Sequence, residues 1–462
     1  MTDLLFADKG QSAHLIHLVD EKNFEDWRKD RPQRLRSLLD AARYDGKTGY
    51  AHQILPSDGD EEWSVVTTVA DVDDLSPWCL ARLAEVLPEG SYRLADGRDP
   101  GPAMLGWILA QHRFDTYLTE KPSEGPRTLL TSNPGKIDGV RRAAEATLLV
   151  RDMVDTPPED MGPAAIEARV RDVAKRYDAS VETVSGDALE QGYPMIHAVG
   201  RAATRSHAPR LVELEWGNTE YPRLAIVGKG VSFDSGGLDI KSSKGMALMK
   251  KDMGGSAHAL ALAQMVMDAK LPVRLHLLIP TVENAIAGNA FRPGDVLKSR
   301  KGITVEIDNT DAEGRLILGD ALAKAGEDNP DLIVDFATLT GAARIALGPD
   351  LPVLFANEDA LARSVEQGGD DVADPVWRLP LWDGYDDMLK SNLADMVNSG
   401  GSGFAGSITA ALFLRRFIPD NTDWMHFDTF AWRPSAKPGR PKGGEALGLR
   451  ATFAMLQERY GL

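Results

Sequence analysis

Three short segments of the sequence combine carboxylates with cations and glycines. They read GKGVSFDSGGLDIK (228–241), LMKKDMGG (248–255) and DNTDAEGRL (308–316). Their charged candidates are Lys229, Asp234, Lys241, Asp252, Asp311, Glu313 and Arg315. Carboxylates gathered at one place repel each other unless they are protonated, paired with cations or bound to metal. Two divalent ions close together would resolve this repulsion and would give a di-metal hydrolase centre.

Other kinds of active site have little support in the sequence. There is no HExxH motif, and the only closely spaced histidine pair, His14 and His17, lies in a strand-like N-terminal segment. A metal site here must therefore be mainly oxygen-ligated. No GxSxG nucleophile elbow occurs and Cys79 has no motif around it, which disfavours serine and thiol nucleophiles. Nucleotide phosphate binding lacks both a P-loop and a GxGxxG after a strand.

The charged positions also have structural explanations. Thr310 and Glu313 fit the S/T-x-x-E capping box of a helix, and Asp252 could cap the helix that follows it. Asp234 could belong to an ordinary turn, and Lys229 could extend its ammonium group from a strand to the surface. In isolation the capping interpretations are the better ones. The coincidence of all these residues at strand ends favours a site.

The elements that would position these residues alternate along the chain. Apolar, β-rich runs lie at 211–216, 223–233, 273–282, 303–307 and 331–339. Helical periodicity predicts helices over 254–270 and 312–327. This alternation indicates βαβ crossovers and an α/β domain whose mostly parallel sheet is covered by helices on both faces. Ligands bind outside the carboxyl ends of strands in such a sheet, which is where the charged segments fall.

A smaller α/β N-terminal domain is expected before this catalytic domain. Strands are predicted at LLFADKG, SAHLIHLV and 63–69, and helices at 75–88 and 102–115. The stretch 120–136 contains three Pro and two Gly and marks a boundary, and a helix over about 137–155 follows it. We therefore predict an N-terminal domain over 1–135, a connecting helix over 136–158 and a catalytic domain over 159–462.

The composition restricts the partners and the compartment. The 462 residues include 69 acidic and 52 basic side chains, a formal net charge of −17. This argues against general binding to nucleic-acid phosphates or to anionic membranes. The single cysteine excludes an internal disulfide framework and is compatible with a reducing cytoplasm. No signal peptide and no apolar run of about 18 residues is evident, so we expect a cytoplasmic protein without a membrane span.

In this order and spacing, the three charged segments closely resemble those of the leucine aminopeptidase (cytosol aminopeptidase) family of di-metal peptidases. The segment TLTGA (338–342) after a strand also matches. The resemblance covers roughly residues 150–462, whereas the N-terminal part is similar only in size and α/β character. It implies a metal-dependent aminopeptidase, a hydrolase that removes the first residue from peptides with a free N-terminus.

The resemblance implies five metal ligands. Asp234 and Glu313 look like the carboxylates that bridge both metals. Asp311 would complete the readily exchanged site, and Lys229 and Asp252 would complete the tighter one. A lysine amine ligates metal only when neutral, so binding should release a proton. Zinc is the expected ion, and the exchangeable site could also take manganese, cobalt or magnesium, because hard oxygen ligands discriminate poorly.

Two cations complete the expected chemistry. Bound metal would activate a water that attacks the scissile carbonyl, and Lys241 would stabilise the developing oxyanion. By similarity to the family, Arg315 holds a bicarbonate that acts as the general base. No protein side chain in the motifs is obviously free for that role.

The resemblance also implies residues of the substrate pocket. Backbone groups of Thr338 and Leu339 would align the substrate chain. Met249, Thr338 and Gly341 match positions that line the pocket for the first side chain, which suggests an apolar preference. Near this pocket the family often has Leu-Asp-Ile-Ala-Gly-x-x-Trp, but here HFDTFAW (426–432) places Phe430 where small residues are usual. The size and preference of the pocket are therefore open.

Two alternatives to a general aminopeptidase remain. One is a narrower dipeptidase or cysteinylglycinase with the same centre. The other is a secondary DNA-binding regulatory role, as in some relatives, for which RKDRPQRLRS (28–37) offers a modest basic cluster. A solvated helix face explains this cluster better in so acidic a chain, so nucleic acid is not an expected partner. The resemblance also implies a homohexamer.

Overall fold

Helix α5 (Ile137–Asp155) carries the chain from one structural unit into the other. The computed structural model describes residues 3–57, 63–121 and 125–461. The smaller unit contains the chain up to Leu148 together with Ser435–Lys442, and the larger unit contains Leu149–Pro434 with Gly443–Leu462. Residues 122–124 of the predicted boundary stretch lie outside the described residues. The sequence-based boundaries at 135 and 158 stay predictions.

The smaller unit is an α/β domain around one sheet. Its elements are β1 (Leu5–Ala7), β2 (His14–Val19), α1 (Phe24–Lys29), α2 (Gln33–Ala41), β3 (His52–Pro56), β4 (Trp63–Thr68), α3 (Ala81–Val86), β5 (Gly90–Leu94), α4 (Ala103–Leu109) and β6 (Arg127–Thr131). The strand order is β1-β6-β5-β2-β4-β3, and only the edge pair β3–β4 is antiparallel. Helices α3 and α4 are shorter than the predicted 75–88 and 102–115. For α3, Pro77 and Pro88 flank the helix and cannot continue it.

The larger unit contains a nine-stranded sheet in the order β16-β15-β18-β14-β9-β11-β8-β7, with β10 paired to β11. These strands are β7 (Ser180–Ser185), β8 (Arg210–Trp216), β9 (Arg223–Gly228), β10 (Gly230–Asp234), β11 (Arg274–Asn284), β14 (Leu332–Ala337), β15 (Val353–Ala356), β16 (Trp377–Arg378) and β18 (Asp423–Asp428). The central strands β18, β14, β9 and β11 run parallel, whereas β8, β7 and β15 pair antiparallel with their inner neighbours. The predicted mostly parallel α/β architecture is confirmed.

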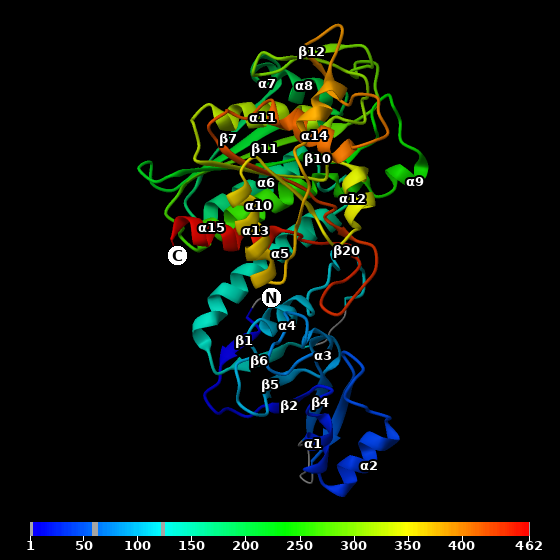
Figure 1. Ribbon diagram of the computed structural model, residues 1–462, viewed down its shortest axis with the longest axis vertical. Coiled ribbons are helices and arrows are strands. Elements are labelled where there is room, and N and C mark those ends of the chain that lie inside the picture. The colour runs from blue at the N-terminus through cyan, green and yellow to red at the C-terminus, as the bar shows by residue number, and fades with distance from the viewer. Residues whose placement is uncertain (1–2, 58–62, 122–124, 462) are drawn as a thin grey trace. The chain divides into compact units, whose positions relative to one another are not determined.

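Helices cover both faces of this sheet, as predicted (Figure 1). On one face lie α8 (Pro194–Gly200), α11 (Gly314–Gly326) and α14 (Gly406–Arg415). On the other lie α6 (Pro163–Arg176), α10 (Gly254–Asp268), α13 (Asp359–Asp371) and α15 (Leu449–Tyr460). The predicted run 303–307 instead forms β13 (Thr304–Glu306) in a separate small sheet with β12 (Val296–Lys298) and β17 (Met396–Val397).

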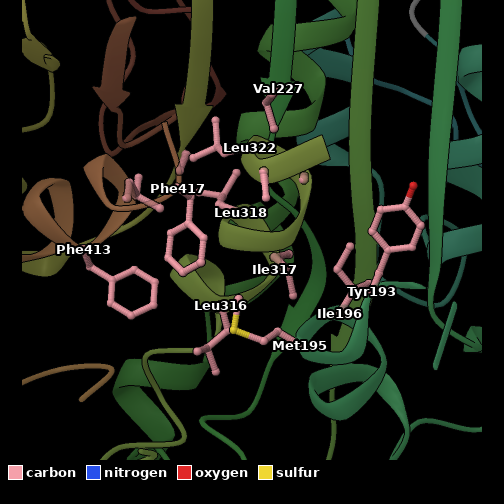
Figure 2. Packing of buried hydrophobic residues seen from close by; sticks show 14 of the residues in the cluster. Tyr193, Met195, Ile196, Val227, Leu316, Ile317, Leu318, Leu322, Phe413 and Phe417 are labelled. Carbon is pink, nitrogen blue, oxygen red and sulfur yellow. The ribbon is translucent and has the colours of Figure 1, made fainter. Parts of the chain in front are cut away.

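The two helices that begin at the charged segments are buried almost all round. Residues 254–267 of α10 are all buried, and α11 is buried except at Lys324. Around α11, Leu316 and Leu318 pack with Phe413 and Phe417 in the main hydrophobic cluster (Figure 2). A helix that is buried on every side is packed against neighbouring elements on every side. Both helices are therefore fixed firmly, and so are the residues at their N-termini.

Among the described residues, no helix combines the length and the apolar composition that a membrane crossing needs.

Candidate active site

Lys229 interrupts the strand that the sequence predicted over 223–233. Strand β9 ends at Gly228, and β10 begins at Gly230. The Lys229 backbone links two neighbours, since its N–H donates to Phe336 O at 3.0 Å and its carbonyl accepts from Ser256 N at 2.8 Å. A Cβ on Gly314 would lie 2.5 Å from Lys229 Cε, so only glycine at that position lets the lysine side chain pass.

The Lys229 ammonium group is buried among oxygen atoms. Nζ lies 2.8 Å from Asp252 Oδ2 and 3.0 Å from Glu313 Oε1, and it donates to Thr338 O at 3.2 Å. Burial alone would lower the pKa of Lys229, but Asp252 and Glu313 raise it above its ordinary value. Burial likewise opposes ionisation of Asp252, yet Lys229 and Lys251 hold its pKa below the usual range. Lys229 is therefore a counterion in this structure and does not reach the surface.

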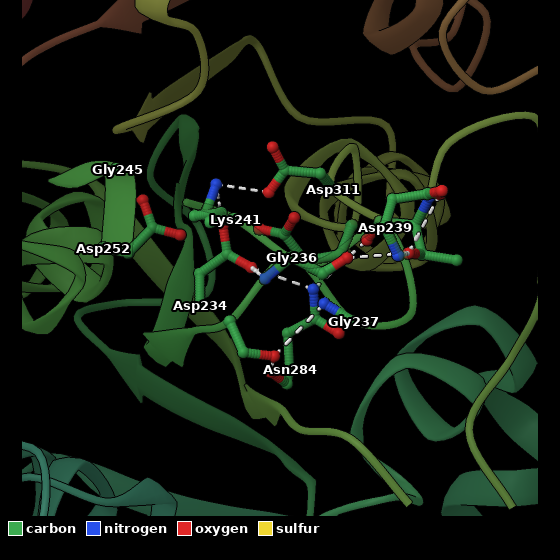
Figure 3. A network of polar contacts seen from close by, with 12 residues as sticks. Asp234, Gly236, Gly237, Asp239, Lys241, Gly245, Asp252, Asn284 and Asp311 are labelled. Carbon is green, nitrogen blue, oxygen red and sulfur yellow. Dashed lines mark hydrogen bonds and ion pairs between the residues drawn. The ribbon is translucent and has the colours of Figure 1, made fainter. Parts of the chain in front are cut away.

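A second cation, Lys241, pairs with the other carboxylates of the site (Figure 3). Lys241 Nζ lies 2.8 Å from Asp234 Oδ2 and also contacts Asp311 Oδ1. The other oxygen of Asp234 accepts hydrogen bonds from Gly236 N and Asn284 Nδ2, both at 2.9 Å. Asp234 thus does form a turn, as the structural explanation proposed, but with only one of its two oxygens.

Asp234, Asp252 and Glu313 present ligand atoms that all lie within 4.8 Å of one another. Glu313 is 1% exposed, and among the described residues neither of its carboxylate oxygens accepts a hydrogen bond. Burial and the nearby Asp234 raise the pKa of Glu313 to about 8, and the same two causes raise the pKa of Asp311 to about 6. Buried carboxylates with free lone pairs beside two amines are a donor set that fits divalent cations.

The capping explanations of this cluster are wrong. Glu313 stands at the N-cap of α11 but its side chain caps nothing, and Met253, not Asp252, precedes α10. Thr310 Oγ1 instead accepts from Asp239 N at 2.8 Å and donates to Gly236 O at 2.7 Å. Thr310 therefore holds the glycine turn of one charged segment against the other.

Arg315 is the second residue of α11 and is buried, and burial lowers its pKa to about 10. Its Nη1 donates to Asn398 O at 2.8 Å, and within the described part of the chain its Nε has no hydrogen-bond partner. The Asn398 side chain also accepts a hydrogen bond from Asp308 N and donates one to Asn309 O. These two bonds fix the loop that carries Asp311. The guanidinium thus keeps a donor for an additional acceptor.

Three of the predicted substrate residues lie in the loop after β14 that starts helix α12 (Gly341–Leu347). Thr338 Oγ1 donates to Asp252 Oδ1 at 2.8 Å, which places this loop directly beside the carboxylate cluster. Leu339 N donates to Asp428 Oδ1 at 3.0 Å, and Gly341 is exposed. The fourth, Met249, is half-buried at the start of the 3-10 helix Met249–Met253 that carries Asp252.

Three residues that hold the site in place were not predicted. Asn284 at the end of β11 fixes Asp234, Asn398 fixes the 308–312 loop, and Asp428 at the end of β18 binds the loop at Thr340. Each lies at the end of a strand or just beyond one. Their position at strand ends is therefore the sequence signal that could have identified them. None of them belongs to a charged segment.

The chain matches known protein families over most of its length. Residues 148–453 match the cytosol aminopeptidase family, catalytic domain, and residues 15–129 match the M17 aminopeptidase, N-terminal domain. The probable cytosol aminopeptidase of Syntrophotalea carbinolica is 40% identical over 370 residues, covering 76% of this chain and 74% of the relative. That of Roseiflexus castenholzii is 38% identical over 375 residues, covering 76% and 75%.

Solved structures agree with these matches. The cytosol aminopeptidase from Coxiella burnetii superposes with a TM-score of 0.94 at 44% identity and covers 99% of this chain and 100% of that one. The bottromycin maturation enzyme BotP in complex with Mn superposes with a TM-score of 0.87 at 29% identity, covering 97% and 100%.

Proposed function

The chain belongs to the cytosol aminopeptidase family, and we propose that it cleaves the N-terminal residue from peptides with two divalent cations in the carboxylate cluster. Family membership, as the sequence predicted, makes it an aminopeptidase and a metal-dependent hydrolase. The proposed ligands are Lys229, Asp234, Asp252, Asp311 and Glu313. When bound, the cations would supply Lewis acidity and would lower the pKa of a water at the site.

One observation carries this proposal. Glu313 is almost fully buried, its oxygens accept no hydrogen bond from any described residue, and Asp234 and Asp252 lie beside it. The nearest cation to Glu313, Lys229 Nζ at 3.0 Å from Oε1, is shared with Asp252, so one ammonium group serves several buried carboxylates. Such incomplete pairing is costly, and a shared divalent cation would remove that cost. Structural carboxylates are, in contrast, normally paired in full.

The chain's own cations have distinct proposed roles. Lys241 lies at the edge of the cluster with its ammonium group between Asp234 and Asp311, where it would donate to a developing oxyanion. Arg315 would hold a bicarbonate as general base through its unpartnered Nε. Thr338 and Leu339 would align the substrate backbone beside Asp252.

Zinc is the proposed ion, with manganese, cobalt or magnesium in the more exposed part of the site near Asp311. The manganese complex of the related enzyme BotP supports a site that accepts such ions. Cytoplasmic localisation and a homohexamer remain proposals from the family resemblance. In the basic cluster over 28–37, Arg28 and Lys29 pair with nearby carboxylates, and nucleic acid is not a proposed partner.

The test removes and restores metal. Protein stripped with a chelator should lose hydrolysis of leucine amide and regain it with zinc, manganese or cobalt. Asp252→Asn and Glu313→Gln should each lower kcat/KM by about 100-fold or more, because even residues that only support ligands cost 10–100-fold. Asp359→Asn, which changes an exposed carboxylate paired with Arg378, is the matched control and should retain activity. Full activity in either site variant would rule out the di-metal assignment.

A further inference from the structure

Two cations lie over the ring of Phe430, the residue that departs from the family pattern. Lys251 Nζ is 5.6 Å and Arg344 Cζ is 4.8 Å from the ring centroid. Cations over an aromatic face are attracted to it, but the ring carries no net charge. The positive charges of Lys251 and Arg344 therefore lie near the same ring, and the ring does not neutralise either of them.

Neither cation is well paired with an acidic side chain. Lys251 is 5% exposed, and its ion pair is to Asp252 Oδ1 at 3.5 Å, an oxygen that already accepts from Thr338 Oγ1 at 2.8 Å. In the described ranges the Arg344 guanidinium has no ion pair and no hydrogen bond, and the residue is exposed. Buried lysines are rare unless paired, so a missing anion is indicated at this place.

This place adjoins the predicted pocket for the first substrate residue. Arg344 Nη2 lies 4.0 Å from where a Cβ on Gly341 would stand. A Cβ on Gly254 would lie 2.5 Å from Ala431 Cβ and 3.1 Å from Thr338 Cγ2, so the segment after Phe430 packs against the substrate loop. Phe430 also occupies volume that a small residue would leave open.

We propose that Lys251 and Arg344 select substrates that present a carboxylate at Phe430. This inference rests on the aminopeptidase function proposed above. The carboxylate has two available sources, namely an acidic side chain on the first residue or the free α-carboxylate of a dipeptide. Either would give both cations a close carboxylate partner, which Arg344 lacks among the described residues and which Lys251 has only in Asp252 at 3.5 Å. If the first side chain supplies the carboxylate, an acidic preference replaces the apolar one expected from Met249, Thr338 and Gly341. If the α-carboxylate supplies it, dipeptides are preferred over longer substrates.

Matched substrate pairs separate the two sources on the metal-loaded enzyme. Glutamyl amide is compared with glutaminyl amide, and leucylglycine with leucylglycinamide, so each pair differs only in one negative charge. We expect kcat/KM to favour the charged member of one pair by about tenfold or more. The pair that responds identifies the source of the carboxylate.

Variants test whether the two cations cause the preference. Arg344→Gln and Lys251→Met should each reduce the ratio within the responding pair toward one. Arg363→Gln removes another exposed arginine, on α13, and should keep the ratio. Arg344→Gln lies outside the buried cluster, so it remains informative if Lys251→Met fails to fold.

Three results would overturn the inference. Equal rates within both pairs would show that no carboxylate is selected. A preference that survives in Arg344→Gln and in folded Lys251→Met would assign it to other residues. A uniform loss for all substrates in Lys251→Met, with the ratio unchanged, would show that Lys251 only positions Asp252. Leucine amide serves as the reference, because inactivity toward every substrate would instead refute the proposed function.

Discussion

At the scale of single residues, Lys229 determines the electrostatics of the cluster. One ammonium group contacts Asp252, Glu313 and the carbonyl of Thr338 in a site with almost no solvent. These carboxylates would repel each other without it. The same lysine is a proposed metal ligand, so a cation that enters the cluster must exchange with a proton.

Metal binding should therefore release protons and strengthen as pH rises. The pKa of Lys229 is raised, and the pKa of Glu313 is raised to about 8, so both groups hold protons at pH 7 that a metal must displace. Calorimetric titration of the metal-free protein with zinc, in two buffers of different ionisation enthalpy, measures the number released. Lys229→Met should release about one proton fewer per chain. Identical heats in both buffers would contradict the exchange.

The charged residues themselves could be predicted because they lie in short, contiguous segments. Carboxylate repulsion and strand-end placement indicated Asp234, Asp252, Asp311 and Glu313 as candidates, and the family resemblance then implied their roles as ligands. Asn284 could not be predicted, because its amide becomes important only when β11 lies beside β10. Pairing between segments far apart in the chain has no local signal.

At the scale of elements, the N-terminus of α10 approaches the segment after β18 very closely. Gly254 opens the helix, and Ala431 has a φ of 53°, a left-handed conformation that is strained for any residue with a Cβ. A Cβ on Gly254 would stand 2.5 Å from Ala431 Cβ, so the two segments can approach this closely only because Gly254 lacks a side chain. This contact joins the helix that follows Asp252 to the segment that carries Phe430.

Gly254→Ala should lower the free energy of unfolding by about 1–3 kcal/mol, because the new methyl group would overlap Ala431 Cβ. Adding Ala431→Gly should restore much of this loss, since it removes the overlap and the strained φ together. Urea unfolding of the metal-free proteins measures both effects. Gly288→Ala is the control, because nothing lies within 4 Å of its Cβ position. Equal losses in the single and double variants would show that the two sites are not coupled.

The long, strongly patterned elements were predicted well, and some of the short ones were missed. The predicted helices at 254–270 and 312–327 correspond to α10 and α11, and the apolar run at 273–282 to β11. The strands β5 and β6 of the smaller unit, five residues each, were missed. Their pairing with distant strands, and not a local alternation, makes them strands.

At the scale of the whole molecule, the candidate active site accounts for only a small part of the net charge of −17. Four carboxylates in the cluster face the two amines of Lys229 and Lys241, which leaves an excess of two negative charges at most, so most of the net charge lies elsewhere on the chain. Large exposed apolar side chains also occur, and Ile345 and Phe404 are each 83% exposed. Exposed apolar residues of this kind are often covered in an assembly.

Light scattering after size exclusion should give six times the mass of the 50.2 kDa chain, as proposed from the family resemblance. An assembly held mainly by apolar contacts should keep this mass when salt is raised from about 0.15 M to about 1 M, since salt screens only charges. The mass of a single chain at every concentration would refute the hexamer.

The segment Ser435–Lys442 has a consequence for the synthesis of this protein. It belongs to the smaller unit, where Gly439 N donates to Glu85 Oε1 at 2.8 Å and the Arg440 guanidinium lies 4.3 Å from the Trp78 ring centroid. The ribosome makes residues up to Leu148 first, and domains generally fold in the order in which they emerge. Here the first unit to appear cannot be completed until nearly the whole chain has left the ribosome. A nascent chain stalled before Ser435 should therefore carry an unfinished N-terminal unit.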